Sequence, residues 1–319
     1  MDKTLKDTNS TKEYVPHHVM EPGPLADKKL TGTWKDYVSV TKVGIITGNM
    51  IPVIAAMVLA AGGLGGFFQL PMLTIVCTLV GTTFIIASGT CLNNFYDRDI
   101  DEKMSRTKNR ALVEGRLNPK NVLIMGFIFA IIGTIMLLFV NVLTTIVALT
   151  GLFFYVVVYT MWVKRAHHIN TIVGSISGAI PPVIGWTAVT ASLDVAAWVL
   201  FVIMFLWQPP HFLAIAMRRC EDYRNAGVPM YPVVKGFEAT KHLIVLYVAA
   251  LVPASLYLFL VTPIGVAYVG LSLALGLGWI IVSLSGYLRK KADDVQWARR
   301  NFTYSLAYLT LLFGGIIFI

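Results

Sequence analysis

The sequence predicts an all-α protein that crosses a membrane nine times. Hydrophobic residues make up 56% of the 319 residues, charged residues only 13%, and the mean hydropathy is +0.69. A soluble domain carries roughly 25% charged residues, so a chain this apolar is expected to lie in a bilayer. The apolar runs are too long for barrel strands, whereas a helix pairs its backbone polar groups within its own segment. Helices are therefore the predicted spans.

Nine runs are long enough to cross, because a spanning helix needs about 20 mostly apolar residues. Residues 1–42 precede the first run, are polar and contain several prolines, so a partly disordered tail is expected before one transmembrane domain of residues 43–319. The predicted spans are residues 43–62, 72–95, 121–140, 142–163, 171–190, 195–217, 243–262, 264–287 and 302–319.

Basic residues predict the orientation. All 26 Lys and Arg residues lie in the tail and in alternate loops, and the intervening loops carry none. Basic loops stay on the cytoplasmic side, so the N-terminus is predicted inside and the C-terminus outside. Orientation and contact with anionic membrane lipid account for the net charge of +9 without a nucleic-acid partner. The tail is rich in acids and lacks Arg, unlike a mitochondrial transit peptide, which favours a bacterial cell membrane.

The second span ends in a dense charge cluster, CLNNFYDRDIDEKMSRTKNRALVEG, residues 91–115. Asn93, Asp97 and Asp101 are spaced i, i+4, i+8, so on a helix they share one face over about two turns. Such a column of hard oxygens suits Mg²⁺, which completes its shell with water and phosphate oxygens. The alternative interpretation is a solvated helix end. We apply that interpretation to Asp99, Glu102 and Lys103, and on a helix Asp99 points away from Asp97 and Asp101.

Basic residues follow the column directly. Arg106, Lys108 and Arg110 lie within five positions, and Lys164 lies in the next basic loop. Arg binds phosphate oxygens in pairs and Lys acts as a point charge, so these cations beside a metal column suit a diphosphate. Ordinary anchoring at the cytoplasmic face is the alternative role.

A second polar cluster follows the sixth span in WQPPHFLAIAMRRCEDYRNAGVPMYPVVKG, residues 207–236. Asp222 is a candidate for a second metal column facing the first. Arg218 lies four residues earlier, so a helical i,i+4 pair would hold it at the mouth of the site. His211 follows two prolines and is either a packing residue or a ligand of an iron.

These motifs resemble a known family. The column N-x3-D-x3-D followed by R-T-K-N-R is similar to that of the UbiA-type intramembrane prenyltransferases. Three further stretches resemble the protohaem IX farnesyltransferase (haem O synthase) family within that superfamily, and the likeness extends from about residue 34 to the C-terminus. They are NTIVGSISGAIPPVIGW at 170–186, WQPPHF at 207–212 and DYRNAGVPMYPV at 222–233.

The resemblance implies nine helices around a central cavity that opens near the cytoplasmic face. It implies Mg²⁺-dependent transfer of the farnesyl group of farnesyl diphosphate to a vinyl group of haem b, which gives haem O. By motif position Asn93, Asp97 and Asp101 should hold Mg²⁺ and diphosphate, and Asp222 should contribute from the second cluster. Haem b, farnesyl diphosphate and membrane lipid are the implied partners, with haem A synthase or oxidase assembly factors as candidates.

One departure from the superfamily concerns the second cluster. Many relatives carry two Asp residues about four positions apart there, whereas this chain has Arg218 before Asp222. Arg218 is therefore expected to bind phosphate or a haem propionate. The span 174–185 is rich in Gly and Ser, which either lets the backbone approach a flat acceptor or permits tight helix packing.

Two other functions remain open. A prenyltransferase acting on an aromatic or quinone-precursor acceptor would carry the same first column, although the stretch 207–233 argues against it. A transporter usually places ionisable groups near the membrane midplane, whereas here the charges gather at one mouth.

Overall fold

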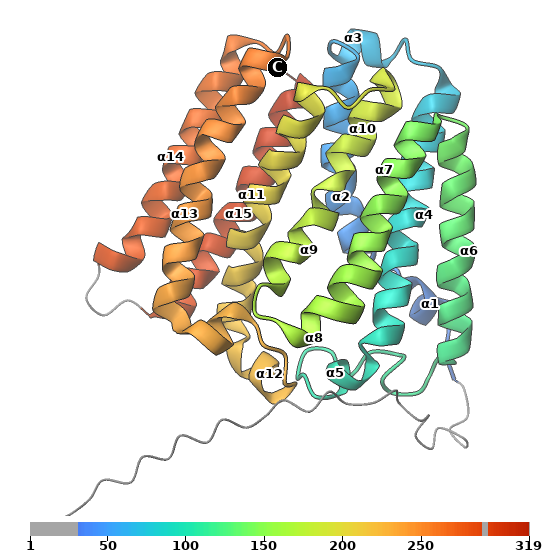
Figure 1. Ribbon diagram of the computed structural model, residues 1–319, viewed down its shortest axis with the longest axis vertical. Coiled ribbons are helices and arrows are strands. Elements are labelled where there is room, and N and C mark those ends of the chain that lie inside the picture. The colour runs from blue at the N-terminus through green and yellow to red at the C-terminus, as the bar shows by residue number, and fades with distance from the viewer. Residues whose placement is uncertain (1–30, 289–292, 319) are drawn as a thin grey trace, which may run out of the picture.

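The computed structural model describes residues 31–288 and 293–318, and its ordered elements are helices (Figure 1). Nine helical stretches within these residues are long and apolar enough to cross a membrane, as predicted. Most of the predicted tail, residues 1–30, lies outside the described part. The elements are α1 (Trp34–Val40), α2 (Val43–Ala60), α3 (Leu64–Phe67), α4 (Met72–Tyr96), α5 (Arg98–Glu102), α6 (Pro119–Leu138), α7 (Val142–Phe153), the π-helix η1 (Phe154–Val163), α8 (Lys164–Ala166), α9 (Asn170–Gly178), α10 (Ile180–Thr190), α11 (Val195–Arg218), α12 (Cys220–Asn225), α13 (Tyr231–Val261), α14 (Val266–Leu288) and α15 (Asp294–Phe318).

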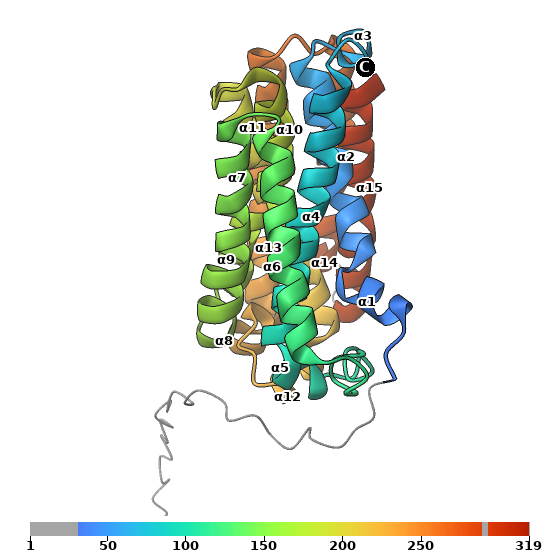
Figure 2. The ribbon, with the colours of Figure 1, turned by 90° about the vertical axis from the view of Figure 1, so that its right-hand side faces the viewer.

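The spanning helices run side by side as a bundle with two distinct ends (Figures 1 and 2). The short helices α1, α5, α8 and α12 lie at one end, and α3 and the C-terminus lie at the other. Helix α4 packs on α6 and α2, α10 packs on α2, and α11 packs on α13 and α15. The charged loops singled out in the sequence are thereby collected at a single end of the bundle.

Two spans begin earlier than predicted. Helix α13 starts at Tyr231 and α15 at Asp294, whereas the apolar runs start at 243 and 302. Gly236, with φ 78°, kinks the added segment of α13. The side chain of Lys241 is only 5% exposed, and its ammonium lies 2.5 Å from the carboxylate of Asp294. This ion pair neutralises one charge in each of the two added helical segments. Hydropathy alone does not predict such segments, because it records only the apolar residues.

Glycines in α9 and α10 serve helix packing. A Cβ at Gly178 would lie 2.1 Å from Gln208 Oε1, and one at Gly185 would lie 2.2 Å from the carbonyl oxygen of Val53. Gly185 therefore admits only glycine, because the backbone of α2 lies against it, and a side chain at Gly178 would displace the amide of Gln208. Of the two interpretations of the span 174–185, tight helix packing is the one that applies at these two residues.

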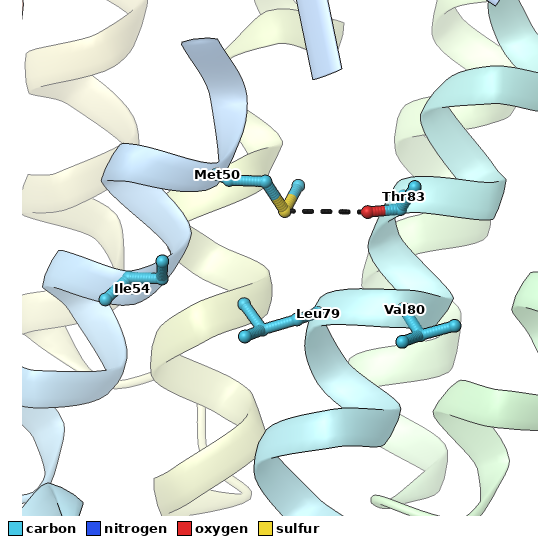
Figure 3. Close-up of a pocket in the computed structure, with 5 residues that line it drawn as sticks. All are labelled: Met50, Ile54, Leu79, Val80 and Thr83. Atoms are coloured by element: carbon cyan, nitrogen blue, oxygen red, sulfur yellow. Dashed lines mark hydrogen bonds between the residues drawn. The ribbon is translucent and has the colours of Figure 1, made fainter. Parts of the chain in front are cut away.

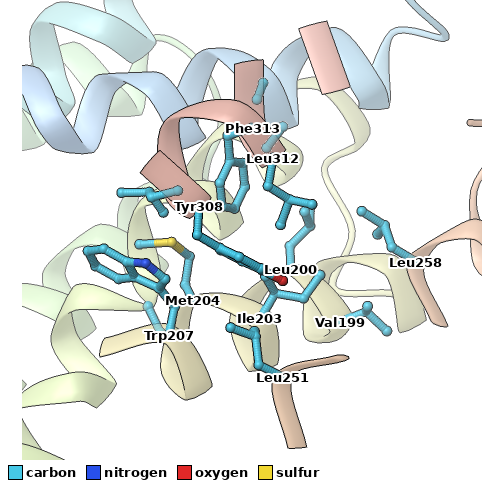
Figure 4. Packing of buried hydrophobic residues seen from close by; sticks show 14 of the residues in the cluster. Val199, Leu200, Ile203, Met204, Trp207, Leu251, Leu258, Tyr308, Leu312 and Phe313 are labelled. Carbon is cyan, nitrogen blue, oxygen red and sulfur yellow. The ribbon is translucent and has the colours of Figure 1, made fainter. Parts of the chain in front are cut away.

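The largest hydrophobic core extends through most of the spanning helices, and Figure 4 shows the part where α11, α13 and α15 meet. Leu200, Leu251, Tyr308 and Phe313 are almost fully buried there. A hollow of about 210 Å³ lies elsewhere, between α2 and α4 (Figure 3). It is lined by Met50, Ile54, Leu79, Val80 and Thr83. The central cavity implied by the resemblance stays a prediction.

Candidate active site

The predicted oxygen column is buried at the charged end of the bundle. Asn93, Asp97 and Asp101 are 4%, 1% and 5% exposed. Asn93 Nδ2 donates to Asp97 Oδ2 at 2.6 Å and to Thr160 Oγ1 of η1 at 3.1 Å. A buried carboxylate raises the free energy of the folded protein unless a cation or a hydrogen-bond donor pairs with it. The partners of these side chains therefore determine which ligands the site can bind.

The column is not carried by one unbroken helix, and that part of the prediction is wrong. Helix α4 ends at Tyr96, Asp97 has φ −87° and ψ 7°, and Asp101 lies in the separate helix α5. The i to i+4 spacing nevertheless persists, because the amide of Asp97 donates to Asn93 O at 2.9 Å and that of Asp101 to Asp97 O at 2.8 Å.

Each member of the column has a cation of its own. Lys42 Nζ donates to Asn93 Oδ1 at 2.8 Å, Lys164 Nζ donates to Asp97 Oδ2 at 2.5 Å, and Arg110 pairs with Asp101. The structure thus brings Arg110 and Lys164 to the column, as predicted for a diphosphate site. Arg106 and Lys108 are exposed on the following loop, and their part in binding stays a prediction.

Lys42 is the site residue that sequence reasoning missed. Lys42 is the last residue of the polar segment 1–42, and neither its spacing nor its neighbours in the chain distinguish it from a lysine that only anchors the protein at the membrane surface. Desolvation, followed by the nearby charges of Arg110 and Lys164, lowers the pKa of its ammonium to about 7. Its position at the column follows only from the packing of the α1–α2 turn.

Asp99 also belongs to this network, against expectation. Arg165 donates to Asp99 Oδ2 at 2.6 Å and to Oδ1 at 2.8 Å, and the same guanidinium lies 3.7 Å from Asp97 Oδ1. The prediction that Asp99 points away assumed a continuous helix. The break after Tyr96 turns Asp99 toward α8 instead.

The donor set fits Mg²⁺. Asp97 Oδ1 is buried and accepts no hydrogen bond, which leaves a hard oxygen directed into the site. Within the described residues no three Asp, Glu, His or Cys side chains gather into a metal cage. Mg²⁺ commonly uses one or two carboxylates together with substrate phosphates and water, so a sparse protein shell suits it. Asn93, Asp97 and Asp101 are the residues that could hold it.

The second cluster meets the first loop through Asp222. Ser105 Oγ donates to both carboxylate oxygens of Asp222, at 2.8 and 2.9 Å, and Arg219 lies 3.9 Å from the same group. The expected i,i+4 pair of Arg218 and Asp222 is wrong, because α11 ends at Arg218 and a separate helix carries Asp222. The guanidinium of Arg218 lies over the ring of Phe302, 5.0 Å from its centroid. Whether Asp222 holds metal stays a prediction.

His211 lies on α11 and packs against α15. Its Nδ1 lies 2.7 Å from Ser305 Oγ, and its ring stacks on Trp207 with the centroids 4.7 Å apart. Phe302 lies on the same ring at 5.0 Å. This arrangement fixes the imidazole and leaves Nε2 as the nitrogen that could reach a ligand.

Aromatic rings also line this end of η1. Tyr155 and Tyr159 stack with their centroids 6.0 Å apart, and the ammonium of Lys164 lies 5.9 Å from the ring of Tyr159. A π-helix is uncommon and often marks a functional site. Here the π-helix places Thr160 within hydrogen-bond distance of Asn93 and places the stacked tyrosines beside Lys164.

Comparisons with known proteins point to one family. The model of the UbiA prenyltransferase family matches residues 49–307. The protoheme IX farnesyltransferase of Alkalihalophilus pseudofirmus is 49% identical over 301 residues, which cover 93% of this chain and 95% of that protein. The structure of a digeranylgeranylglyceryl phosphate synthase superposes with a TM-score of 0.73 at 17% identity, covering 89% of this chain and 97% of that one.

A UbiA homologue from Archaeoglobus fulgidus bound to GPP and Mg²⁺ superposes with a TM-score of 0.64 at 15% identity, covering 89% of this chain and 100% of that one. Both structures share the helical fold. The family model spans most of the chain, and the sequence relative covers nearly all of it. The chain therefore belongs to the UbiA prenyltransferase family.

Proposed function

We propose that this protein transfers the farnesyl group of farnesyl diphosphate to a vinyl group of haem b, giving haem O. The site supports a prenyl diphosphate through one observation above all, the pairing of each column residue with its own cation. The acceptor follows from the relative named protoheme IX farnesyltransferase and from its 49% identity along nearly the whole chain.

Binding of the diphosphate uses the cations already at the column. Lys164 and Arg110 are positioned to contact phosphate oxygens and to offset the charge of the leaving group. Asn93, Asp97 and Asp101 would hold Mg²⁺, with Asp222 as a candidate further ligand. When bound, Mg²⁺ supplies Lewis-acid stabilisation of the departing diphosphate.

Ionisation breaks the bond between C1 of the farnesyl group and the diphosphate oxygen, and the electron pair leaves with the diphosphate. The allylic cation is delocalised and would react with water. The stacked rings of Tyr155 and Tyr159 lie beside Lys164 and can face such a cation. The terminal carbon of the vinyl group of haem b then forms a bond to C1, which leaves a cation on the vinyl carbon next to the porphyrin. A water molecule adds to that carbon and loses a proton, which gives the hydroxyl of haem O and completes the transfer.

The membrane setting suits both substrates. A C15 chain and a porphyrin are each largely apolar, and burial among helices keeps them and the cation away from water. The charged groups of both, diphosphate and propionates, can remain at the polar end of the bundle. Arg218 is proposed to contact one of these anionic groups.

The test uses membranes that contain the full chain, incubated with haem b, farnesyl diphosphate and Mg²⁺, with the haems identified by mass. We expect haem O from the wild type and none from Asp97→Asn. A parallel reaction replaces haem b by an aromatic acid acceptor. Prenylation of that acid without haem O would transfer the assignment to an aromatic acceptor.

A further inference from the structure

The turn between α1 and α2 is held firmly by α4. Thr90 Oγ1 donates to the carbonyl oxygen of Thr41 at 2.8 Å, and Asn94 Nδ2 donates to that of Val40 at 2.8 Å. Thr90 and Asn94 are 1% and 3% exposed, so both hydrogen bonds form within the protein interior. They flank Asn93 on the same helical turn and thereby fix the turn opposite it.

Lys42 occupies this turn in a strained backbone conformation. Its φ of 52° and ψ of 61° lie in the left-handed region, which residues with a Cβ rarely adopt. Among the described residues only Lys42 and Ala191 are non-glycine residues with positive φ. Strain of this kind persists where the surroundings impose it, and it concentrates at functional sites.

The strained backbone directs the ammonium of Lys42 to Asn93 Oδ1, at 2.8 Å. The carboxylates of Asp97 and Asp101 are each paired with a cation, whereas Lys42 contacts the neutral amide oxygen of Asn93. The local network contains Lys42, Lys164, Arg165 and Arg110 against the carboxylates of Asp97, Asp99 and Asp101. Four basic side chains thus face three carboxylates, and Lys42 is the one whose hydrogen-bond partner is a neutral amide.

We propose that Lys42 binds the diphosphate of the prenyl substrate, a role for the α1–α2 turn that lies outside the charged motifs of residues 93–110. This inference rests on the proposed function. Asn93 Oδ1 would hold either the ammonium or Mg²⁺, because two cations repel each other on one amide oxygen. With Mg²⁺ there, the ammonium of Lys42 would be free to contact the nearest phosphate oxygen. The fixed turn limits that movement to the flexible side chain.

The left-handed backbone offers a sharp test, because glycine adopts it without strain. Lys42→Gly removes the ammonium and relieves the backbone at the same time. If Lys42 serves only to hold the turn, this variant loses the bond to Asn93 while its affinity for diphosphate stays unchanged. Ala191→Gly is the matched control, since it relieves the same conformation between α10 and α11 at the far end of the bundle.

The measurement is the affinity of the purified full chain for inorganic pyrophosphate and for farnesyl diphosphate, each with Mg²⁺, by calorimetry. Thermal stability is recorded for every variant. We expect Lys42→Gly to melt no lower than the wild type and to bind both ligands about tenfold more weakly, the loss of one charge-assisted contact. Lys42→Arg should recover most of the affinity, and Ala191→Gly should bind as the wild type does.

Equal affinity of Lys42→Gly and the wild type would overturn the role of Lys42. A Lys42→Gly protein that unfolds would be replaced by Lys42→Met, to which the same affinity criterion applies. A wild type that binds pyrophosphate but not farnesyl diphosphate would instead contradict the proposed prenyl donor. The two failures are therefore distinguishable.

Discussion

The side chain of Asp97 links three other residues of the site. It accepts a hydrogen bond from Asn93, forms an ion pair with Lys164 and lies near Arg165, while its second oxygen accepts no hydrogen bond. A carboxylate in this position can neutralise cations before the substrate binds and can offer an oxygen to a metal afterwards.

We expect Asp97→Asn and Asp101→Asn to lower turnover more than a hundredfold, because each removes a charge worth several kcal/mol near the leaving group. Asp99→Asn should lower turnover less, since Asp99 acts through Arg165. Glu102→Gln, at an exposed carboxylate of the same helix, serves as the control. Haem O formation and melting temperature are measured together. Equal losses for Asp99→Asn and Asp97→Asn would contradict this ranking.

His211 gives a second prediction at the same scale. Its Nδ1 is held by Ser305, which orients Nε2 in the way that a second hydrogen bond orients a metal-binding histidine. We expect His211→Ala to weaken haem binding and shift the Soret band, with the affinity for farnesyl diphosphate unchanged. Ser305→Ala should shift the band less. A normal haem spectrum in His211→Ala would exclude His211 as a ligand.

At the scale of the elements, the site is assembled where helices break. The ends of α4 and α11 each lead into a short charged helix, α5 and α12, and the loop after α5 meets α12 through Ser105 and Asp222. Apolar residues of the same segments, including Ile100, Met104, Val228 and Met230, form a small separate core beneath this contact. The two loops therefore form one unit over the polar end of the site.

Loss of the Ser105 hydroxyl should loosen this unit. In Ser105→Ala, Asp222 keeps only the distant Arg219 and a long contact to the backbone amide of residue 105. We expect faster hydrogen exchange in both α5 and α12, with the rate elsewhere unchanged. Ser192→Ala, in the loop at the opposite end, is the control. Faster exchange in only one of the two helices would argue against a joint unit.

At the scale of the whole molecule, charge separates the two ends. The short charged helices lie at one end of the bundle and the C-terminus lies at the other (Figure 1). We propose that the charged end faces the cytoplasm, because basic segments are retained there. The diphosphate site would then open toward the cytoplasm, where the released diphosphate can dissolve.

A topology measurement tests this orientation. A reporter active only outside the cytoplasm should be active when fused after Ile319 and inactive when fused in the loop between α5 and α6. Nine spans place these two points on opposite sides of the membrane. Activity of the reporter at the second position would show that the protein is inserted the other way round.

Hydropathy and spacing determined the spanning helices, the charged end and the core of the site. Nine apolar runs fix nine helices because lipid leaves the backbone no other partner. The spacing of Asn93, Asp97 and Asp101 predicted their common place, and the cations Arg110 and Lys164 could be predicted from their position beside membrane ends. Each of these features depends on residues that are close together in the chain, so each can be predicted from the sequence.

Tertiary structure alone decided which groups pair. Lys42 lies 51 residues from Asn93 in the chain, and its contact depends on how α4 holds the α1–α2 turn. The partners of Asp99 and Asp222 depend on helix breaks at Tyr96 and Arg218, which an apolar pattern with i,i+4 spacing does not record. Periodicity describes a helix that continues, whereas this site is built where α4 ends at Tyr96 and α11 ends at Arg218, and the pairing there depends on residues that are distant in the chain.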